Sequence, residues 1–467
     1  MLTEATLKDK ITDLFDKNQD KIFSNDPPEV KKIRQDSFEE FRRLDFPTAK
    51  LEAWKNTDLR KILSQDFSFY FEPGKEEIDI DQIFQCEVPD FDTHIISLYN
   101  GWYVYHDKPL LTLPNGTIIG SFARALKEYP DLVLKHYNKY AERNKNGLNA
   151  LNTAYAQDGI FIYVPDGVEA YKTIQMVNVL DREENLFVQN RNLVILGKNS
   201  KLKLVHCDDS QNHKSSFTNT VTEVFMDEGA NLDHYKLQNL NDDTSLVNST
   251  FFHQEANSQL TTFAVSLNGG LIRNDIRTRL NGEGCDANIF GLYLVDKEQH
   301  VDNQVFVDHA FPNCTSNELF KGILDDHANA VFKGHILVRK DAQKTNAFQT
   351  NRNVLLTDKA TVNTKPFLEI YADDVKCSHG ATVGQLDDEA LFYIKSRGIS
   401  EYNAKLLLMY AFAAEIINKI TLEPLKDRMD DLVKKRLRGE LAVCSQCVLH
   451  CKNQENEYEF EIDMSKL

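Results

Sequence analysis

Residues 255–295 read EANSQLTTFAVSLNGGLIRNDIRTRLNGEGCDANIFGLYLV, in which β-branched and aromatic runs alternate with short polar turns. Val, Ile, Phe and Tyr favour extended strands, whereas Gly, Asn and Asp favour turns. Runs of this kind recur from about Gly159 to Val383, and no helical periodicity of apolar residues interrupts them. The sequence therefore predicts a long central region built from strands.

Small residues recur in the turns of this region. Ser200, Ala230, Ala256 and Ala287 each lie close before an apolar position, and successive members are 30, 26 and 31 residues apart. Solenoids of stacked strands have repeats of this order. Crossover helices, which would indicate βαβ units, are not predicted between the strands. The spacing favours a parallel β-helix over a β-sandwich and leaves the sandwich open as an alternative.

Helices are predicted before the strands. Thr6 to Phe23 and Pro28 to Leu44 place apolar residues three and four positions apart, which is typical of amphipathic helices. A third, shorter run covers 51–63 and contains Trp54. The next part is mixed, with a strand-like stretch, HIISLYNGWYVYH, followed by a helix that is expected from Ser121 to about Tyr140.

Two more helices are expected after the strands. Ser400 can cap a helix that runs to about Ile420, because a serine side chain accepts hydrogen bonds from the first free N–H groups. This helix is apolar over most of its circumference, so we expect it to be buried on more than one side. A second helix, from Pro424 to about Arg438, has a narrower apolar stripe. Such a pair either docks a partner or packs on its own β domain.

These patterns divide the chain into four segments. The predicted segments are a helical domain at 1–95, a β core at 96–385 with a mixed leading part at 96–158, a helical domain at 386–451, and an acidic tail at 452–467.

Bulk composition excludes some classes of partner and indicates a cellular compartment. The formal net charge of −17 repels phosphate backbones, so nucleic acid is not an expected partner. The longest apolar run, Leu406 to Ala414, is far shorter than the roughly 20 residues of a membrane span. The N-terminus has no apolar core of a secretory signal, and the 8 cysteines are then expected as thiols or metal ligands in a reducing, cytoplasmic compartment.

Common nucleotide and catalytic motifs are missing from the sequence. It contains no Walker A pattern, no GxGxxG after a strand, no GxSxG and no HExxH. The chain is therefore not expected to bind a nucleotide through a phosphate loop.

Cys377 and His379 are the first candidates for metal chemistry. Their spacing of two residues places both on one face of a strand. A thiol and an imidazole are two donors, whereas a closed zinc site needs four. A second subunit could complete the site, or the pair could be a buried cysteine beside a hydrogen-bonded histidine.

The C-terminal tail contains a second group of candidate ligands. The stretch CSQCVLHC offers Cys444, Cys447, His450 and Cys451 within a few residues, and it resembles half of many zinc or iron–sulfur sites. The alternative is a thiol-rich tail without a metal. The remaining cysteines, Cys86, Cys207, Cys285 and Cys314, are interpreted as packing or incidental thiols.

Several long stretches resemble one family. Residues 376–400, KCSHGATVGQLDDEALFYIKSRGIS, are similar to the signature of the SufB/SufD family of iron–sulfur cluster assembly proteins. The stretches at 300–324, at 331–381, at 46–59 (FPTAKLEAWKNTDL) and at 151–168 resemble further blocks of that family. Ser378 and Gly380 stand where SufB-like sequences have acidic residues, so the chain looks more like SufD than SufB.

The resemblance implies a fold and a role. The family fold is a right-handed parallel β-helix flanked by N-terminal and C-terminal helical domains. The implied role is a non-catalytic scaffold in a SufBCD complex, which pairs with a SufB-like subunit and binds a SufC-like ATPase through its C-terminal helices. Six residues of those helices are the expected docking positions: Tyr402, Leu406, Tyr410, Leu425, Met429 and Leu432.

The resemblance also implies a cargo. Cys377 and His379 match family positions at the SufB–SufD interface, where iron or an iron–sulfur cluster would be held transiently and shared with SufB. Thiolate and imidazole donors suit such ligation. A flavin is implied for the complex only.

Three alternatives stay open at this point. The chain could be a SufB-type subunit that itself holds the nascent cluster, or a homodimer when it is alone. From a different class, it could be a β-helix enzyme that acts on polysaccharides, although the missing secretion signal counts against that reading.

Overall fold

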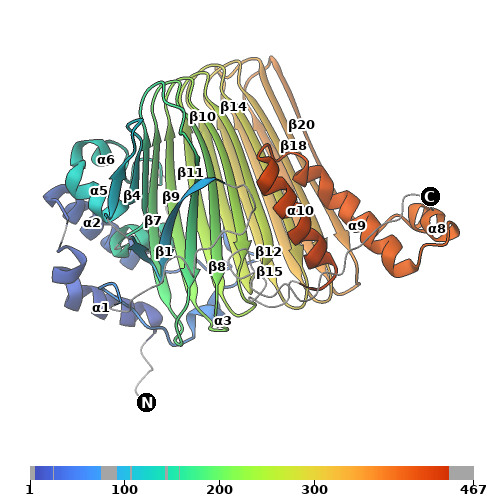
Figure 1. Ribbon diagram of the computed structural model, residues 1–467, viewed down its shortest axis with the longest axis horizontal. Coiled ribbons are helices and arrows are strands. Elements are labelled where there is room, and N and C mark those ends of the chain that lie inside the picture. Colours follow the sequence, from blue (N-terminus) through green and yellow to red (C-terminus); the bar gives the residue numbers. More distant parts are fainter. Residues whose placement is uncertain are drawn as a thin grey trace.

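The fold is a parallel β-solenoid of about eight turns, flanked by N-terminal and C-terminal helices (Figure 1). The structure is a computed structural model and describes residues 6–24, 26–74, 92–105, 108–141, 146–156 and 158–440. The mainly β fold class and the flanking helices that the sequence predicts are confirmed.

Two ten-stranded sheets form the walls of the solenoid. The first sheet contains, in spatial order, β2 (Trp102–Val104), β1 (Thr93–Tyr99), β6 (Thr173–Leu180), β8 (Lys201–Ser210), β10 (Asn231–Asn239), β12 (Gln259–Asn268), β14 (Asp286–Val295), β16 (Thr315–Leu324), β18 (Thr345–Leu355) and β20 (Val375–Gly384). The second contains β19 (Thr361–Ile370), β17 (Asn329–Val338), β15 (His300–His309), β13 (Leu271–Leu280), β11 (Ser245–Gln254), β9 (Phe217–Met226), β7 (Phe187–Leu196), β5 (Ile160–Val164), β4 (Ile118–Ser121) and β3 (Leu110–Thr112).

A ladder of small buried residues marks one corner of the solenoid. It occupies the position directly before five middle strands of the first sheet, β8 to β16, and its members are Ser200, Ala230, Ser258, Cys285 and Cys314. The predicted members Ser200 and Ala230 belong to it, but Ala256 and Ala287 lie beside it. The reason is chemical: the Ser200 hydroxyl donates to the carbonyl of Gly197 (2.7 Å), and the Cys285 thiol donates to that of Gly282 (3.2 Å). A serine hydroxyl or a cysteine thiol therefore fits this corner position as well as an alanine methyl group does.

N-terminal helices cover the outer face of the second sheet. They are α1 (Leu7–Ile22), α2 (Pro28–Leu44), α5 (Phe122–Glu128), α6 (Pro130–His136) and α7 (Gly147–Tyr155). The single helix expected from Ser121 to Tyr140 is two helices, because Pro130 begins a new one after the cap of the first. α7 has no predicted counterpart. All of its residues are buried between α2 and strands β7 and β9, and the Asn152 side chain donates to backbone carbonyls of both strands, of Asn190 (2.9 Å) and of Asn219 (2.9 Å).

The short run at 51–63 is not one helix. It forms η1 (Glu52–Trp54) and α3 (Arg60–Leu63), separated by a segment that is tied to the second sheet. The Thr57 hydroxyl donates to Asp302 (2.5 Å), and the Trp54 ring lies over the Arg273 guanidinium at 3.7 Å. These contacts hold the segment against the second sheet and interrupt the helix that local propensity alone favours.

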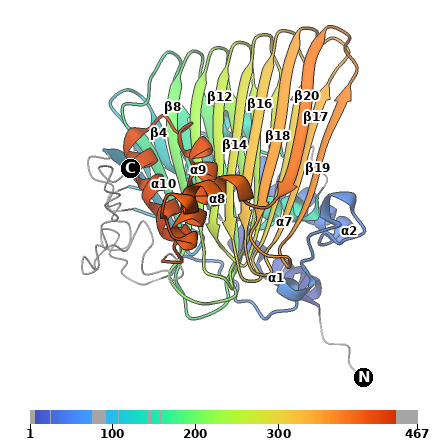
Figure 2. The ribbon, with the colours of Figure 1, turned by 90° about the vertical axis from the view of Figure 1, so that its right-hand side faces the viewer.

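The C-terminal helices are α8 (Asp388–Ser396), α9 (Glu401–Ile417) and α10 (Glu423–Leu437). Figures 1 and 2 show α9 and α10 lying across the outer face of the first sheet. Their buried side chains form one apolar cluster with outward-facing residues of β6 to β16. No helix in the described parts of the chain is long and apolar enough to cross a membrane.

Candidate functional site

The last turn of the solenoid is open. β20 pairs only with β18 and β19 pairs only with β17, so each strand leaves one edge without a neighbour in the described structure. This end lies opposite the N-terminal helices (Figure 1). Large apolar side chains are exposed around it: Phe348, Phe367, Ile370, Tyr371 and Val383. Unpaired strand edges with exposed apolar side chains are typical of surfaces that another chain covers.

Cys377 and His379 lie on β20 at this open end. Cys377 is half-buried against the apolar interior, whereas His379 is exposed. Burial raises the pKa of the Cys377 thiol, and a backbone hydrogen bond from Ala347 opposes that shift. The thiol is therefore protonated at neutral pH until a metal ion or a partner stabilises the thiolate.

Two donors do not make a closed metal site. Within the part of the chain that the structure describes, no group of three or more His, Cys, Asp or Glu side chains is arranged to hold a metal ion. The tail candidates Cys444, Cys447, His450 and Cys451 lie outside the described residues. Cys285 and Cys314 are buried at the corner and donate to backbone carbonyls there.

Two polar side chains lie directly inside the open turn. Glu318 on β16 pairs in register with Gln349 on β18, which pairs in register with His379 on β20. Gln349 Nε2 donates to Glu318 Oε2 at 2.6 Å. Burial raises the pKa of the Glu318 carboxyl to about 8, although the bond from Gln349 lowers it in part. The sequence analysis missed both residues, since only the strand register aligns them with His379.

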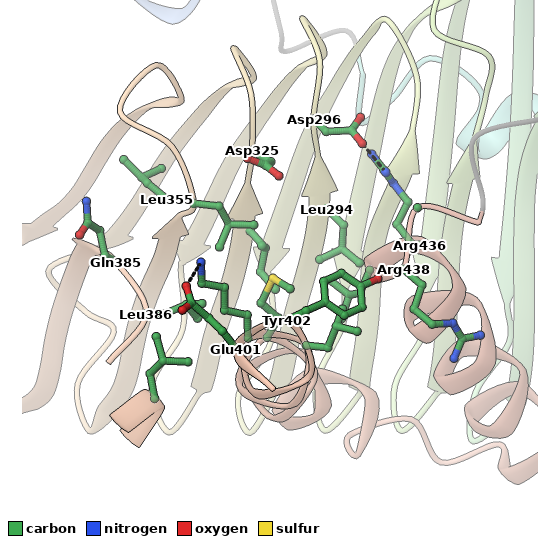
Figure 3. Close-up of a pocket in the computed structure, with 18 of the residues that line it drawn as sticks. Leu294, Asp296, Asp325, Leu355, Gln385, Leu386, Glu401, Tyr402, Arg436 and Arg438 are labelled. Atoms are coloured by element: carbon green, nitrogen blue, oxygen red, sulfur yellow. Dashed lines mark hydrogen bonds and ion pairs between the residues drawn. The ribbon is translucent and has the colours of Figure 1, made fainter. Parts of the chain in front are cut away.

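A groove of about 640 Å³ separates the N-terminal part of α9 from the end of α10 (Figure 3). Leu294, Leu355 and Leu386 supply apolar walls. Its charged groups are mostly paired: Arg436 contacts Asp296 (2.6 Å), and Glu401 contacts Lys405 (3.0 Å).

The six expected docking residues have different surroundings. Tyr402 is 61% exposed at the groove, and Leu406 is half-buried in its wall. Tyr410 is half-buried and donates to Asp430 on α10. Leu425, Met429 and Leu432 are fully buried against the first sheet. They are packing residues of this chain, because an apolar stripe on α10 is needed to hold the helix on the sheet. A partner would therefore meet Tyr402 and Leu406 rather than these three side chains.

Comparisons with known proteins agree with the geometry. Residues 178–412 match the family described as SUF system FeS cluster assembly, SufBD core domain. Residues 5–176 match the SufBD protein N-terminal region. An iron–sulfur cluster assembly SufBD family protein of Synechocystis is 30% identical over 413 residues, which cover 86% of this chain and 90% of that protein.

Two further relatives extend this result. The iron–sulfur cluster assembly protein SufD of Escherichia coli is 34% identical over 299 residues, or 62% of this chain and 69% of that protein. The chloroplastic protein ABCI7 of Arabidopsis thaliana is 29% identical over 420 residues, or 87% of this chain and 86% of that protein. The resemblance to SufD that Ser378 and Gly380 indicated is in line with these matches. The chain belongs to the SufBD family of iron–sulfur cluster assembly proteins.

Proposed function

We propose that this chain is a non-catalytic scaffold subunit of iron–sulfur cluster assembly, and that it pairs with a SufB-type subunit through the open end of its solenoid. The observation that carries the proposal is the position of Cys377 and His379 on β20, the last strand of the first sheet, with its outer edge unpaired. A partner strand placed along that edge would cover the exposed apolar side chains and enclose both donors.

The two donors would then act together with groups of the partner. His379 supplies a neutral imidazole nitrogen, and Cys377 supplies a thiolate once a bound iron ion displaces its proton. The partner supplies the remaining ligands, because the described residues of this chain bring only two to the site. Iron or the nascent cluster is the cargo of such a site and is passed on.

We place the ATPase contact at the groove beside α9. Tyr402 offers an exposed aromatic ring there, and α8 adds the exposed side chains of Phe392 and Tyr393. Exposed aromatic side chains beside an apolar groove are frequent anchors of protein interfaces. ATP hydrolysis would then belong to the partner. The predicted cytoplasmic location stays a prediction.

Co-purification tests the proposal. The chain is expressed with SufB-type and SufC-type proteins of the same source, and the complex is weighed by native mass spectrometry. We expect one copy of this chain, one SufB-type subunit and two ATPase subunits. A chain that stays alone, or pairs only with itself, would contradict the pairing.

Two alanine variants test the site within that complex. Cys377→Ala and His379→Ala should leave the complex intact, since both side chains lie at the open end and neither is fully buried. Cluster assembly, followed by anaerobic reconstitution, should be impaired in both. Assembly at the wild-type level in both variants would refute the site. A stable, stoichiometric cluster on this chain alone would instead favour a SufB-type role.

A further inference from the structure

A polar ladder leads from the solenoid interior to its open end. Glu318, Gln349 and His379 occupy registered positions on the neighbouring strands β16, β18 and β20. Ala347 and Cys377, two residues before Gln349 and His379, both pack in the apolar interior. Because alternate residues of a strand share one face, Gln349 and His379 project to the same side as these residues. The ladder therefore lies next to apolar residues of the interior.

The Gln349 amide is fixed from two sides. Glu318 has no exposed surface, Gln349 is 1% exposed, and their hydrogen bond of 2.6 Å directs the NH₂ group of Gln349 toward Glu318. Gly334 on β17 lies against the other side of the amide. A Cβ at Gly334 would come within 2.1 Å of Gln349 Nε2, so the second sheet leaves room here because it has no side chain.

One acceptor of this amide is unused. Gln349 Oε1 is buried and has no hydrogen-bond partner among the described residues. A buried polar atom without a partner is destabilising, because it has lost its hydrogen bonds to water. The next rung outward places His379 opposite Gln349, at the spacing of about 4.8 Å that separates neighbouring strands. Since His379 is exposed, its ring can turn toward the free oxygen.

We infer that Gln349 is a positioning residue for His379: its Oε1 accepts one ring N–H and leaves the other ring nitrogen free to bind a metal ion. A hydrogen bond at one ring nitrogen determines which nitrogen carries the proton. Glu318 acts one step further inward by holding the NH₂ group of Gln349 away from the histidine. The inferred hydrogen bond does not depend on the proposed function, whereas its consequence for iron binding rests on it.

The protonated nitrogen of His379 can be observed directly. The full-length chain is labelled with ¹⁵N-histidine, and His379→Gln identifies the signals of His379. We expect one neutral tautomer to dominate in the wild type. Gln349→Met removes the acceptor at similar volume and should give a mixture of tautomers. Glu318→Gln should preserve the wild-type signal, because its amide oxygen still accepts from Gln349.

Gln238 provides a matched control. It is an equally buried amide inside the solenoid, on β10, where it donates to Asn274 (2.8 Å) and accepts from Ser266 (2.8 Å). Gln238→Met should lower stability but leave the His379 signals unchanged. The inference is overturned if Gln349→Met keeps the wild-type tautomer, or if Gln238→Met shifts it equally.

Metal affinity separates this inference from the proposed function. Loss of a partner that orients a ligating histidine weakens metal binding by about 10–100-fold. We expect a loss of that size for Fe(II), added anaerobically to the co-purified complex that carries Gln349→Met, and none for the complex that carries Gln238→Met. One combination of results separates the two hypotheses: Gln349→Met changes the tautomer, but neither Gln349→Met nor His379→Gln changes the Fe(II) affinity. The hydrogen bond between Gln349 and His379 would then be confirmed, and the role of His379 in iron binding would be refuted.

Discussion

A carboxyl group in an apolar interior is more stable with its proton, and Glu318 is in that position. Its pKa is raised to about 8 by burial, against an ordinary value of 4.5. Between pH 4.5 and about pH 8, Glu318 keeps its proton in the folded chain and releases it in the unfolded chain. The free energy of unfolding therefore falls as the pH rises from about 4.5 to 8.

Glu318→Gln tests this at the scale of one residue. The amide cannot ionise and still accepts from Gln349, so the variant should exceed the wild type in stability at pH 8 by on the order of 2–4 kcal/mol. The gain should vanish near pH 4, where the wild-type carboxyl is protonated in both states. Melting curves at both pH values measure the difference.

An exposed acid supplies the control. Glu401→Gln should bring no gain at pH 8, because two lysines lower the pKa of this carboxyl to about 2. An equal stability of Glu318→Gln and the wild type at pH 8 would show that Glu318 is ionised in the folded chain.

At the scale of residues, part of the candidate site can be predicted from the sequence and part cannot. The placement of Cys377 and His379 on one face follows from strand alternation, which is a local rule. Gln349 and Glu318 could not be found in this way. They are 30 and 31 residues from their partners in the register, and other rungs of the same sheet are offset by 27 to 30 residues. The turns set these offsets, and their lengths do not follow a fixed repeat.

At the scale of elements, the C-terminal helices combine packing on their own sheet with an exposed flank. Sequence periodicity placed both α9 and α10 correctly. It could not separate the buried stripe from the exposed flank, because Leu425 and Leu406 are equally apolar. α7 shows the opposite case: its polar residues Asn149, Asn152 and Thr153 are as buried as its apolar ones, and its 9 residues give too short a pattern to detect.

Two substitutions separate packing from docking. Met429→Ala removes a side chain that is 1% exposed within the cluster beneath α10, and it should destabilise the chain by roughly 2–4 kcal/mol. Hydrogen exchange should rise in α10 before it rises in the strands. Tyr402→Ala removes a 61% exposed side chain and should leave stability unchanged, while it weakens ATPase binding at least tenfold.

The reverse pattern would contradict this division. If Met429→Ala left stability unchanged, the cluster beneath α10 would not hold the helix. If Tyr402→Ala bound the ATPase as well as the wild type did, the groove would not be the contact, and the partner would have to be sought on another face.

At the scale of the whole molecule, the repeat of strand and turn determines the solenoid. The sequence predicted the strands and their approximate period, because β-branched runs and turn residues are local signals. It did not predict that the middle turns would enclose charged groups. Lys236 and Asp208 form a buried ion pair of 2.6 Å inside the solenoid, and His206 lies 2.6 Å from the same ammonium group. Such groups interrupt the apolar pattern, so the sequence alone does not show which wall they line.

Buried histidines make the folded chain sensitive to acid. Burial lowers the pKa of His136, His206 and His309 to about 4, from an ordinary value of 6.5. Between these values the unfolded chain binds protons that the folded chain excludes, so the free energy of unfolding falls as the pH falls. At pH 5 each histidine should lower the free energy of unfolding by roughly 1–2 kcal/mol. The three losses together outweigh the gain of about 2–3 kcal/mol that the protonated Glu318 contributes.

We therefore expect the melting temperature to fall from pH 7 to pH 5, and His309→Gln to reduce that fall. His309 accepts or donates one bond, to Ser316 at 2.8 Å, and glutamine can replace that bond without taking up a proton. The informative quantity is the slope with pH, because the substitution also changes packing and shifts stability equally at both pH values. An unchanged slope would mean that His309 takes up its proton equally in the folded and unfolded chain, and the acid sensitivity would then have to arise from His136 and His206.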